Sequence, residues 1–101
     1  MCYGLTPKTL KDIIAVFAQY PEVEQAILYG SRAKGNYRSG SDIDITLKGT
    51  PLNMSTLFKI MEQLEQLELP YEIDLSLYTQ LENTSLLEHI EQVGKVIYPQ
   101  H

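Results

Sequence analysis

The stretch that decides the fold covers residues 30–48 and reads GSRAKGNYRSGSDIDITLK. It begins with a glycine-serine pair that follows the apolar run at 26–29, and it continues through a polar loop. It ends with Asp42 and Asp44, which stand one residue apart at the start of another apolar segment. In an extended strand, side chains two residues apart project to the same face. We therefore expect Asp42 and Asp44 to present paired carboxylates to one point in space.

The residue types in this stretch suit a metal ion and a nucleotide. Carboxylate oxygens are the hard ligands that Mg²⁺ prefers, and the ion usually takes one or two of them and completes its shell with water and substrate phosphate. Gly30 and Ser31 add backbone N–H groups with little side-chain bulk at the start of a short helix, a position that favours an anionic phosphate. Arg32 and Lys34 could offset phosphate charge, or could be ordinary surface cations.

A third carboxylate comes from the segment at 71–78, which alternates between two faces. One face carries Tyr71, Ile73, Leu75 and Leu77, and the other carries Glu72, Asp74 and Ser76. If this strand neighbours the Asp42 strand in one sheet and both apolar faces point inward, Asp74 lies on the side of Asp42 and Asp44. Three clustered carboxylates repel one another unless cations compensate them. A bound divalent metal ion therefore explains this clustering better than three carboxylates without a function do.

Each of these features also has a purely structural interpretation. An aspartate pair at a strand start can mark a turn or a solvated edge, and a glycine-serine pair can be an ordinary strand-to-helix turn. Their combination with Asp74 favours the functional interpretation. His89 lies among apolar residues of a predicted helix, where we expect a structural or exposed role, and His101 is terminal. Neither histidine has the companions of a metal site or a catalytic triad.

Strands and helices alternate along the chain. Helices are predicted from the Thr6-Pro7 cap to an exit at Pro21, at 31–34, from about Asn53 to Pro70, and over 84–93. Strands are predicted at 26–29, at 42–48 and around Asp74, with a last extended segment at 96–98. This alternation predicts an α/β (α+β) fold with a mixed β-sheet and flanking helices. A chain of 101 residues is expected to form a single domain over 1–101.

Composition narrows the classes of function. A net charge of −5 argues against a general nucleic-acid backbone binder, because such proteins carry basic patches. The one cysteine, Cys2, cannot form an internal disulfide, which fits a reducing compartment. No apolar run is long enough to span a membrane, and no signal-peptide pattern follows Met1. We therefore expect a cytoplasmic protein with no membrane partner.

The chain resembles the minimal nucleotidyltransferase (MNT) proteins of the DNA polymerase β-like superfamily. Gly30-Ser31, ten intervening residues and the Asp42-to-Asp44 triplet match the glycine-serine and double-aspartate signature of that superfamily without a gap. Asp74 falls where the family places its third carboxylate. The resemblance covers nearly the whole chain, and it implies a polymerase β-like nucleotidyltransferase core.

The resemblance also implies an activity and its cofactors. Asp42, Asp44 and Asp74 would hold two Mg²⁺ ions, and the glycine-serine turn would contact the β- and γ-phosphates of the nucleotide. Either Arg32 or Lys34 would offset charge on the departing pyrophosphate. ATP would be the donor, and AMP would be transferred to an acceptor hydroxyl.

The likeness is close to the antitoxin half of HEPN/MNT toxin–antitoxin pairs, in which the nucleotidyltransferase adenylylates a tyrosine of the HEPN ribonuclease. Larger superfamily members carry further domains that bind the acceptor, so here a partner or a second copy is expected to supply that surface. The leading hypothesis is a Mg²⁺-dependent protein adenylyltransferase that acts on ATP and a helical HEPN toxin. Two alternatives stay open. One is a binding module with a vestigial nucleotide site that blocks its HEPN partner by complex formation, and the other is a subunit that modifies a small molecule such as an aminoglycoside.

Overall fold

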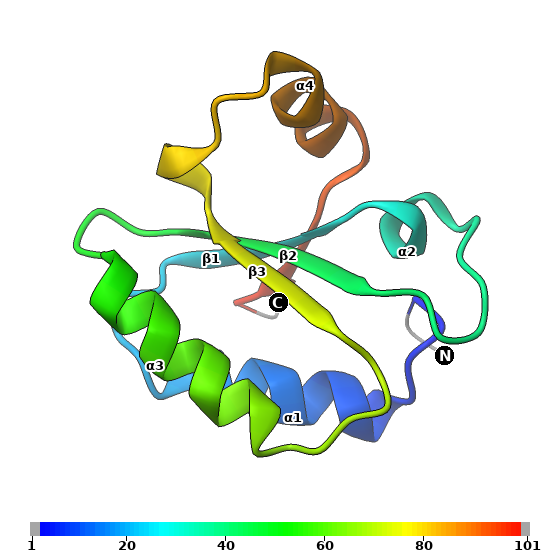
Figure 1. The fold of residues 1–101 in the computed structure, drawn as a ribbon, viewed down its shortest axis with the longest axis horizontal. Coiled ribbons are helices and arrows are strands. Elements are labelled where there is room, and N and C mark those ends of the chain that lie inside the picture. The colour runs from blue at the N-terminus through cyan, green and yellow to red at the C-terminus, as the bar shows by residue number, and fades with distance from the viewer. Residues whose placement is uncertain (1–2, 100–101) are drawn as a thin grey trace.

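One four-stranded sheet forms the centre of the structure, a computed structural model that describes residues 3–99. The strands are β1 (Gln25–Tyr29), β2 (Ile43–Lys48), β3 (Ile73–Leu77) and β4 (Lys95–Tyr98). Their order across the sheet is β3-β2-β1-β4 (Figure 1). β1 pairs antiparallel with β2 and β4, whereas β2 pairs parallel with β3. This mixed sheet with its flanking helices confirms the fold class expected from the sequence.

Two long helices cover one face of the sheet. α1 (Pro7–Ala18) and α3 (Met54–Glu65) lie side by side beneath the strands in Figure 1. The core on this side contains the buried side chains of Leu10, Ile13, Phe17, Leu28, Ile43, Ile45, Leu47, Leu57, Ile60, Leu64, Leu75 and Leu77. Burying a side chain of this size contributes roughly 1.5–3 kcal/mol. Because alternate residues of a strand point to opposite faces, this core turns the polar residues of β2 and β3 to the other face.

Side-chain caps determine where three of the helices begin. Thr6 caps α1 by accepting a hydrogen bond at 3.1 Å from the backbone N–H three residues further on. Asn53 caps α3 in the same way at 2.9 Å, and Asn83 caps α4 (Thr84–Val93) at 3.1 Å. A cap of this kind is worth about 1 kcal/mol. The helix starts expected at Thr6 and near Asn53 are confirmed.

The opposite face of the sheet is only partly covered. α4 lies above this face in Figure 1, and its one buried residue, Ile90, packs with Ile27 and Tyr29 of β1. The short helix α2 (Ser31–Lys34) follows β1, and a 3-10 turn, η1 (Tyr78–Gln80), follows β3. The polar side chains of β2 and β3 therefore lie on a face that carries one lightly attached helix.

Some element boundaries differ from the expectation. α3 ends at Glu65 rather than near Pro70, and Glu68 in the following turn has a φ of +53°, which an α-helix cannot contain. β2 begins at Ile43, so Asp42 immediately precedes the strand. The extended segment expected at 96–98 is part of β4, which joins the sheet at its edge.

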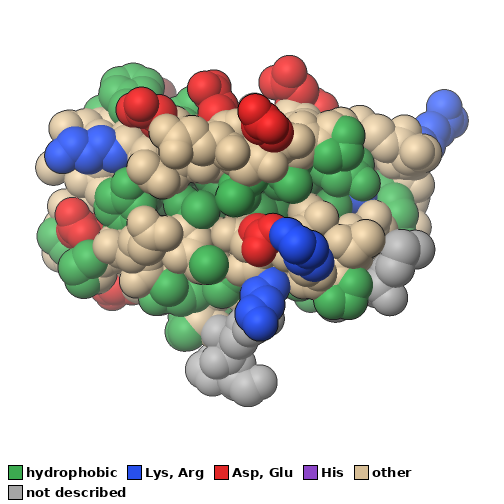
Figure 2. Space-filling model, turned by 90° about the horizontal axis from the view of Figure 1, so that it is seen from below, with side chains coloured by type: hydrophobic (Ala, Val, Ile, Leu, Met, Phe, Trp, Pro, Cys, Tyr) green, Lys and Arg blue, Asp and Glu red, His purple; other side chains and the backbone are tan. Residues whose placement is uncertain are grey.

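The outer side of the α1–α3 layer carries apolar side chains. Hydrophobic side chains run along the middle of this face, and acidic side chains gather along one margin (Figure 2). Phe58 and Met54 of α3 are 59% and 38% exposed. Within residues 3–99, no helix is both long and apolar enough to cross a membrane.

Candidate active site

Asp44 and Asp74 lie side by side on neighbouring strands. The parallel pairing of β2 with β3 sets Asp44 opposite Asp74 in register. Residues paired in this way point to the same face, and neighbouring strands are about 4.8 Å apart. Both carboxylates therefore lie on the sheet face opposite α1 and α3. The structure brings them together as the alternation of the two strands predicts.

Asp42 lies just before β2, and its negative charge acts on the Asp44 carboxyl. Asp42 and Asp74 are exposed, whereas Asp44 is half-buried. Burial raises the pKa of the Asp44 carboxyl, and the negative charges of Asp74 and Asp42 raise it further, against a lowering effect of His89. The Asp44 anion is therefore disfavoured where it stands. A cation bound beside it would remove that penalty.

The carboxylates form an open set of oxygen donors rather than a closed metal cage. Among residues 3–99, no group of three or more His, Cys, Asp or Glu side chains is arranged to hold a metal ion. The expected convergence of Asp42, Asp44 and Asp74 on one point is thus looser than the sequence suggests. The donor chemistry still fits Mg²⁺, which needs only one or two carboxylates when water and phosphate oxygens complete its shell.

Gly30 packs directly against this acidic set. Its φ is +77° and its ψ is −157°, a backbone region that only glycine adopts readily. A Cβ built on Gly30 would overlap the Oδ2 atom of Asp44. The turn at the end of β1 therefore needs glycine for two independent reasons, conformation and close approach. It brings the backbone N–H of Gly30 and the half-buried Ser31 next to the carboxylates.

Arg32 holds the loop instead of facing a phosphate. Its side chain is only 2% exposed. Nε and Nη2 donate to the Ser41 carbonyl at 3.1 and 2.7 Å, and Nη1 donates to the Tyr3 carbonyl at 3.0 Å. The guanidinium also lies over the rings of Tyr37 and Tyr71, 5.4 and 4.7 Å from their centroids. These contacts correct the interpretation of Arg32 as a phosphate cation. Of the two expected cations, only Lys34 at the end of α2 is exposed.

His89 is the site residue that the sequence analysis missed. Its Nε2 atom accepts a hydrogen bond from the backbone N–H of Gly30 at 2.9 Å. Its ring meets the Tyr29 ring edge-on, with centroids 6.2 Å apart and planes at 80°. The expected structural role is confirmed, and the residue that His89 contacts is the glycine of the candidate nucleotide turn. The only signal in the sequence was that His89 precedes Ile90, which anchors α4. His101 and Cys2 lie outside the described residues.

Tyr29 and Ser76 complete the polar surroundings of the carboxylates. Burial raises the pKa of the Tyr29 phenol, and the negative charges of Asp74 and Asp44 raise it further. The Oγ atom of Ser76 is buried and has no hydrogen-bond partner within residues 3–99. The phenol of Tyr29 therefore stays uncharged at neutral pH and borders the carboxylates on their β1 side.

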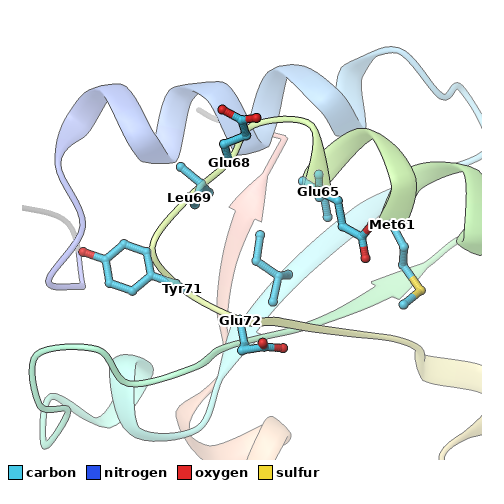
Figure 3. A pocket seen from close by; sticks show the side chains of 8 residues that line it. Met61, Glu65, Glu68, Leu69, Tyr71 and Glu72 are labelled. Carbon is cyan, nitrogen blue, oxygen red and sulfur yellow. The ribbon is translucent and has the colours of Figure 1, made fainter.

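A hollow of about 210 Å³ lies elsewhere, between α3 and the start of β3. Figure 3 shows its labelled lining, in which the side chains of Met61, Leu69 and Tyr71 accompany the carboxylates of Glu65, Glu68 and Glu72. None of the candidate site residues lines it. The carboxylate set on the sheet is therefore a separate, more open feature of the surface.

The glycine turn and the carboxylates lie in a region that matches a known protein family. A model of the polymerase beta nucleotidyltransferase family matches residues 11–101. The chain belongs to the polymerase beta nucleotidyltransferase family. The matched region contains the glycine-serine turn, the aspartate pair and Asp74, so the superfamily expected from the sequence is confirmed.

Solved structures share this polymerase beta fold at low sequence identity. A toxin–antitoxin structure with AMP-PNP has a TM-score of 0.72 at 21% identity, covering 91% of this chain and 74% of that one. A complex of tri-AMPylated Shewanella oneidensis HEPN toxin with MNT antitoxin has a TM-score of 0.66 at 19% identity, covering 92% and 71%. A putative nucleotidyltransferase from Sulfolobus solfataricus has a TM-score of 0.55 at 21% identity, covering 88% and 76%. No curated protein sequence matches the chain.

Proposed function

We propose that this protein is a Mg²⁺-dependent nucleotidyltransferase that transfers AMP from ATP to a hydroxyl group of a partner protein. The observation that carries the proposal is the in-register pair of Asp44 and Asp74 beside the Gly30 turn. Membership of the polymerase beta nucleotidyltransferase family supports the same chemistry. The penalty on the Asp44 anion supports a bound cation, because a divalent ion would offset it.

The residues of the chain have distinct roles in this proposal. Asp42, Asp44 and Asp74 would hold the Mg²⁺ ions, which when bound neutralise phosphate charge and lower the pKa of the acceptor hydroxyl. Asp74, which is exposed, would take up the hydroxyl proton as the hydroxyl oxygen attacks the α-phosphorus. The bond from the α-phosphorus to the bridging oxygen then breaks, and pyrophosphate leaves.

Backbone and loop residues would bind the rest of the nucleotide. The Gly30 N–H and the Ser31 hydroxyl would donate to phosphate oxygens, and Lys34 would offset charge on the departing pyrophosphate. Arg32 contributes indirectly, because it fixes the loop that leads to Asp42. Each of these groups thus acts on the phosphates or on the loop that positions the metal ligands.

The proposed acceptor is a tyrosine of a helical HEPN toxin, with this protein as the antitoxin. Support comes from two structures of the same fold, a toxin–antitoxin structure with AMP-PNP and a complex of tri-AMPylated HEPN toxin with MNT antitoxin. The acidic set is open on the sheet face, which leaves room for a partner to present a hydroxyl group. A reducing, cytoplasmic location stays a prediction from the single cysteine.

A binding module without catalysis is the second candidate, and two observations favour it. The Gly30 N–H already has a partner in His89, and the carboxylates form no closed metal group within residues 3–99. Such a module would neutralise a HEPN toxin by covering it. The two candidates differ in whether the toxin is modified.

Intact-mass spectrometry separates these candidates. The protein is incubated with the HEPN-type product of its adjacent gene, ATP and Mg²⁺, and the neighbour is examined for an AMP-sized addition. We expect the addition with wild type and with Glu62→Gln, an exposed acid on α3, and no addition with Asp42→Asn/Asp44→Asn. Inhibition of the neighbour by wild type without any mass addition would establish the binding module instead.

A further inference from the structure

One contact joins α4 to the turn that the proposed function assigns to phosphate. The Nε2 atom of His89 accepts the hydrogen bond from the Gly30 N–H at 2.9 Å, across 59 positions of the sequence. Because Nε2 is the acceptor, a neutral His89 ring carries its proton on Nδ1. The edge-on contact with Tyr29 fixes the orientation of the ring. The imidazole therefore occupies the backbone donor that a phosphate oxygen would use.

The helix that carries His89 is lightly attached. α1 buries five of its residues and α3 buries four, but α4 buries only Ile90. Ile90 packs in a small cluster with Ile27 and Tyr29, separate from the main core, and the partly buried Leu86 of α4 packs against the same cluster. A hydrogen bond of 3.1 Å between the exposed Tyr78 hydroxyl and Glu91 adds one further link. A helix held by so little buried surface can shift at a lower cost than α1 or α3.

We propose that His89 is a gate residue of the nucleotide site. In the free protein it occupies the Gly30 N–H, and it must leave before a nucleotide phosphate can take that donor. The inference rests on the proposed function, because it takes the Gly30 turn as the phosphate site. A hydrogen bond to an ionised phosphate is stronger than one to a neutral imidazole, so nucleotide binding drives the exchange. The bond that is lost lowers the apparent affinity of the wild-type protein.

Removal of the imidazole is therefore expected to tighten nucleotide binding. The Kd of the full chain for AMP-PNP with Mg²⁺ is measured by calorimetry for wild type, His89→Ala and Gln92→Ala. We expect His89→Ala to lower the Kd by about two- to tenfold, the factor that corresponds to one ordinary hydrogen bond. Gln92→Ala is the matched control, because Gln92 is exposed on the same helix. An unchanged or raised Kd in His89→Ala would overturn the gate, and a raised Kd would make His89 a phosphate ligand.

A second measurement uses the wild-type protein and does not depend on how the variant folds. Nitrogen-15 NMR follows the Gly30 amide and the His89 Nε2 resonance during titration with AMP-PNP and Mg²⁺. Both signals are expected to move together, with Nε2 shifting toward the value of an imidazole that accepts no hydrogen bond. Saturation with nucleotide that leaves the His89 Nε2 signal in place would overturn the proposal.

The outcomes also separate the gate from the proposed function. If wild type binds AMP-PNP and His89→Ala binds it no better, only the gate fails. If both proteins are folded and neither binds AMP-PNP, the phosphate site at Gly30 fails, and the gate and the nucleotidyltransferase activity fail with it. Binding by His89→Ala alone supports both.

Discussion

Gly30 and Asp44 are packed so closely that no β-carbon fits between the backbone of one and the carboxylate of the other. The contact joins the end of β1 to the start of β2, where Tyr29 pairs with Asp44. A side chain at position 30 would therefore displace the half-buried carboxylate of Asp44. Backbone conformation and the position of a proposed metal ligand are coupled through one residue.

Gly30→Ala is expected to destabilise the protein by about 3 kcal/mol or more, because a strained φ costs about 1–3 kcal/mol and the overlap with Asp44 adds to it. Gly35→Ala is the matched control. Gly35 has a φ of +88°, but a Cβ there would meet nothing within 4 Å. Urea unfolding of both variants measures the difference. Equal losses of stability would show that the contact with Asp44 has no energetic weight.

Asp44→Asn is expected to abolish AMP transfer while leaving the metal-free protein at least as stable as wild type at pH 7. The raised pKa means that the Asp44 contribution to stability is fully present below the pKa of the unfolded state and is lost as pH rises through the raised folded value. At neutral pH the charged Asp44 therefore opposes folding, and a neutral amide does not. The loss of activity should exceed the loss of about 10–100-fold that is typical when a residue hydrogen-bonded to a metal ligand is replaced.

Thermal unfolding in EDTA and in Mg²⁺ tests this prediction for Asp44. Wild type should gain stability from Mg²⁺ and Asp44→Asn should not, while Glu62→Gln should behave as wild type. A marked loss of stability of Asp44→Asn in EDTA would contradict the prediction.

Arg32→Lys is expected to lower stability by about 2–4 kcal/mol, because hydrogen bonds from a charged group contribute roughly 1.5–3 kcal/mol each and lysine cannot reproduce the planar fork. The two carbonyl groups that lose their donors belong to Tyr3 and Ser41. Lys34→Ala, on the exposed end of the same short helix, should stay within about 0.5 kcal/mol of wild type. Guanidinium unfolding without nucleotide measures both. Full stability of Arg32→Lys combined with lost ATP affinity would restore the phosphate role for Arg32.

Ser76→Ala is expected to leave stability unchanged or to raise it by up to about 1–2 kcal/mol, because it removes a buried hydroxyl without a partner. Thr46→Val on the neighbouring strand provides the contrast. The Thr46 hydroxyl donates to the Ser76 carbonyl at 3.4 Å, so its removal should cost about 0.5–1 kcal/mol. Chemical denaturation of the two variants gives the comparison. A clear loss in Ser76→Ala would mean that its hydroxyl binds the Tyr29 phenol in solution.

The alternation of residues in two strands predicted the acidic pair on the condition that the two strands are neighbours in one sheet, which the structure shows. It gave the face of Asp74 relative to Asp44, and the parallel register of β2 and β3 then set the two side by side. Helix starts were equally predictable, because the caps at Thr6 and Asn53 are local signals. Patterns of this kind report on neighbours along the chain, and they predict the fold well.

The contacts that could not be predicted are those between distant segments. Arg32 reaches the carbonyl of Tyr3, and His89 reaches the N–H of Gly30, 59 positions away. A pattern of apolar residues shows which side of a helix is buried, but not which loop that helix lies over. From the sequence alone, Arg32 is therefore equally consistent with binding a phosphate and with binding backbone carbonyl groups of a loop.

The hydrogen bond from Arg32 to the Tyr3 carbonyl has a practical consequence for handling the protein. The same guanidinium also donates to the Ser41 carbonyl just before Asp42, so it connects the backbone at Tyr3 to the segment that leads into Asp42. An affinity tag fused ahead of Tyr3 would begin within a few residues of a carbonyl group that Arg32 binds, whereas a tag after β4 would follow a strand that contains neither of these carbonyl groups. Preparations tagged at opposite ends should therefore be compared before a weak AMP-transfer activity is attributed to the protein itself.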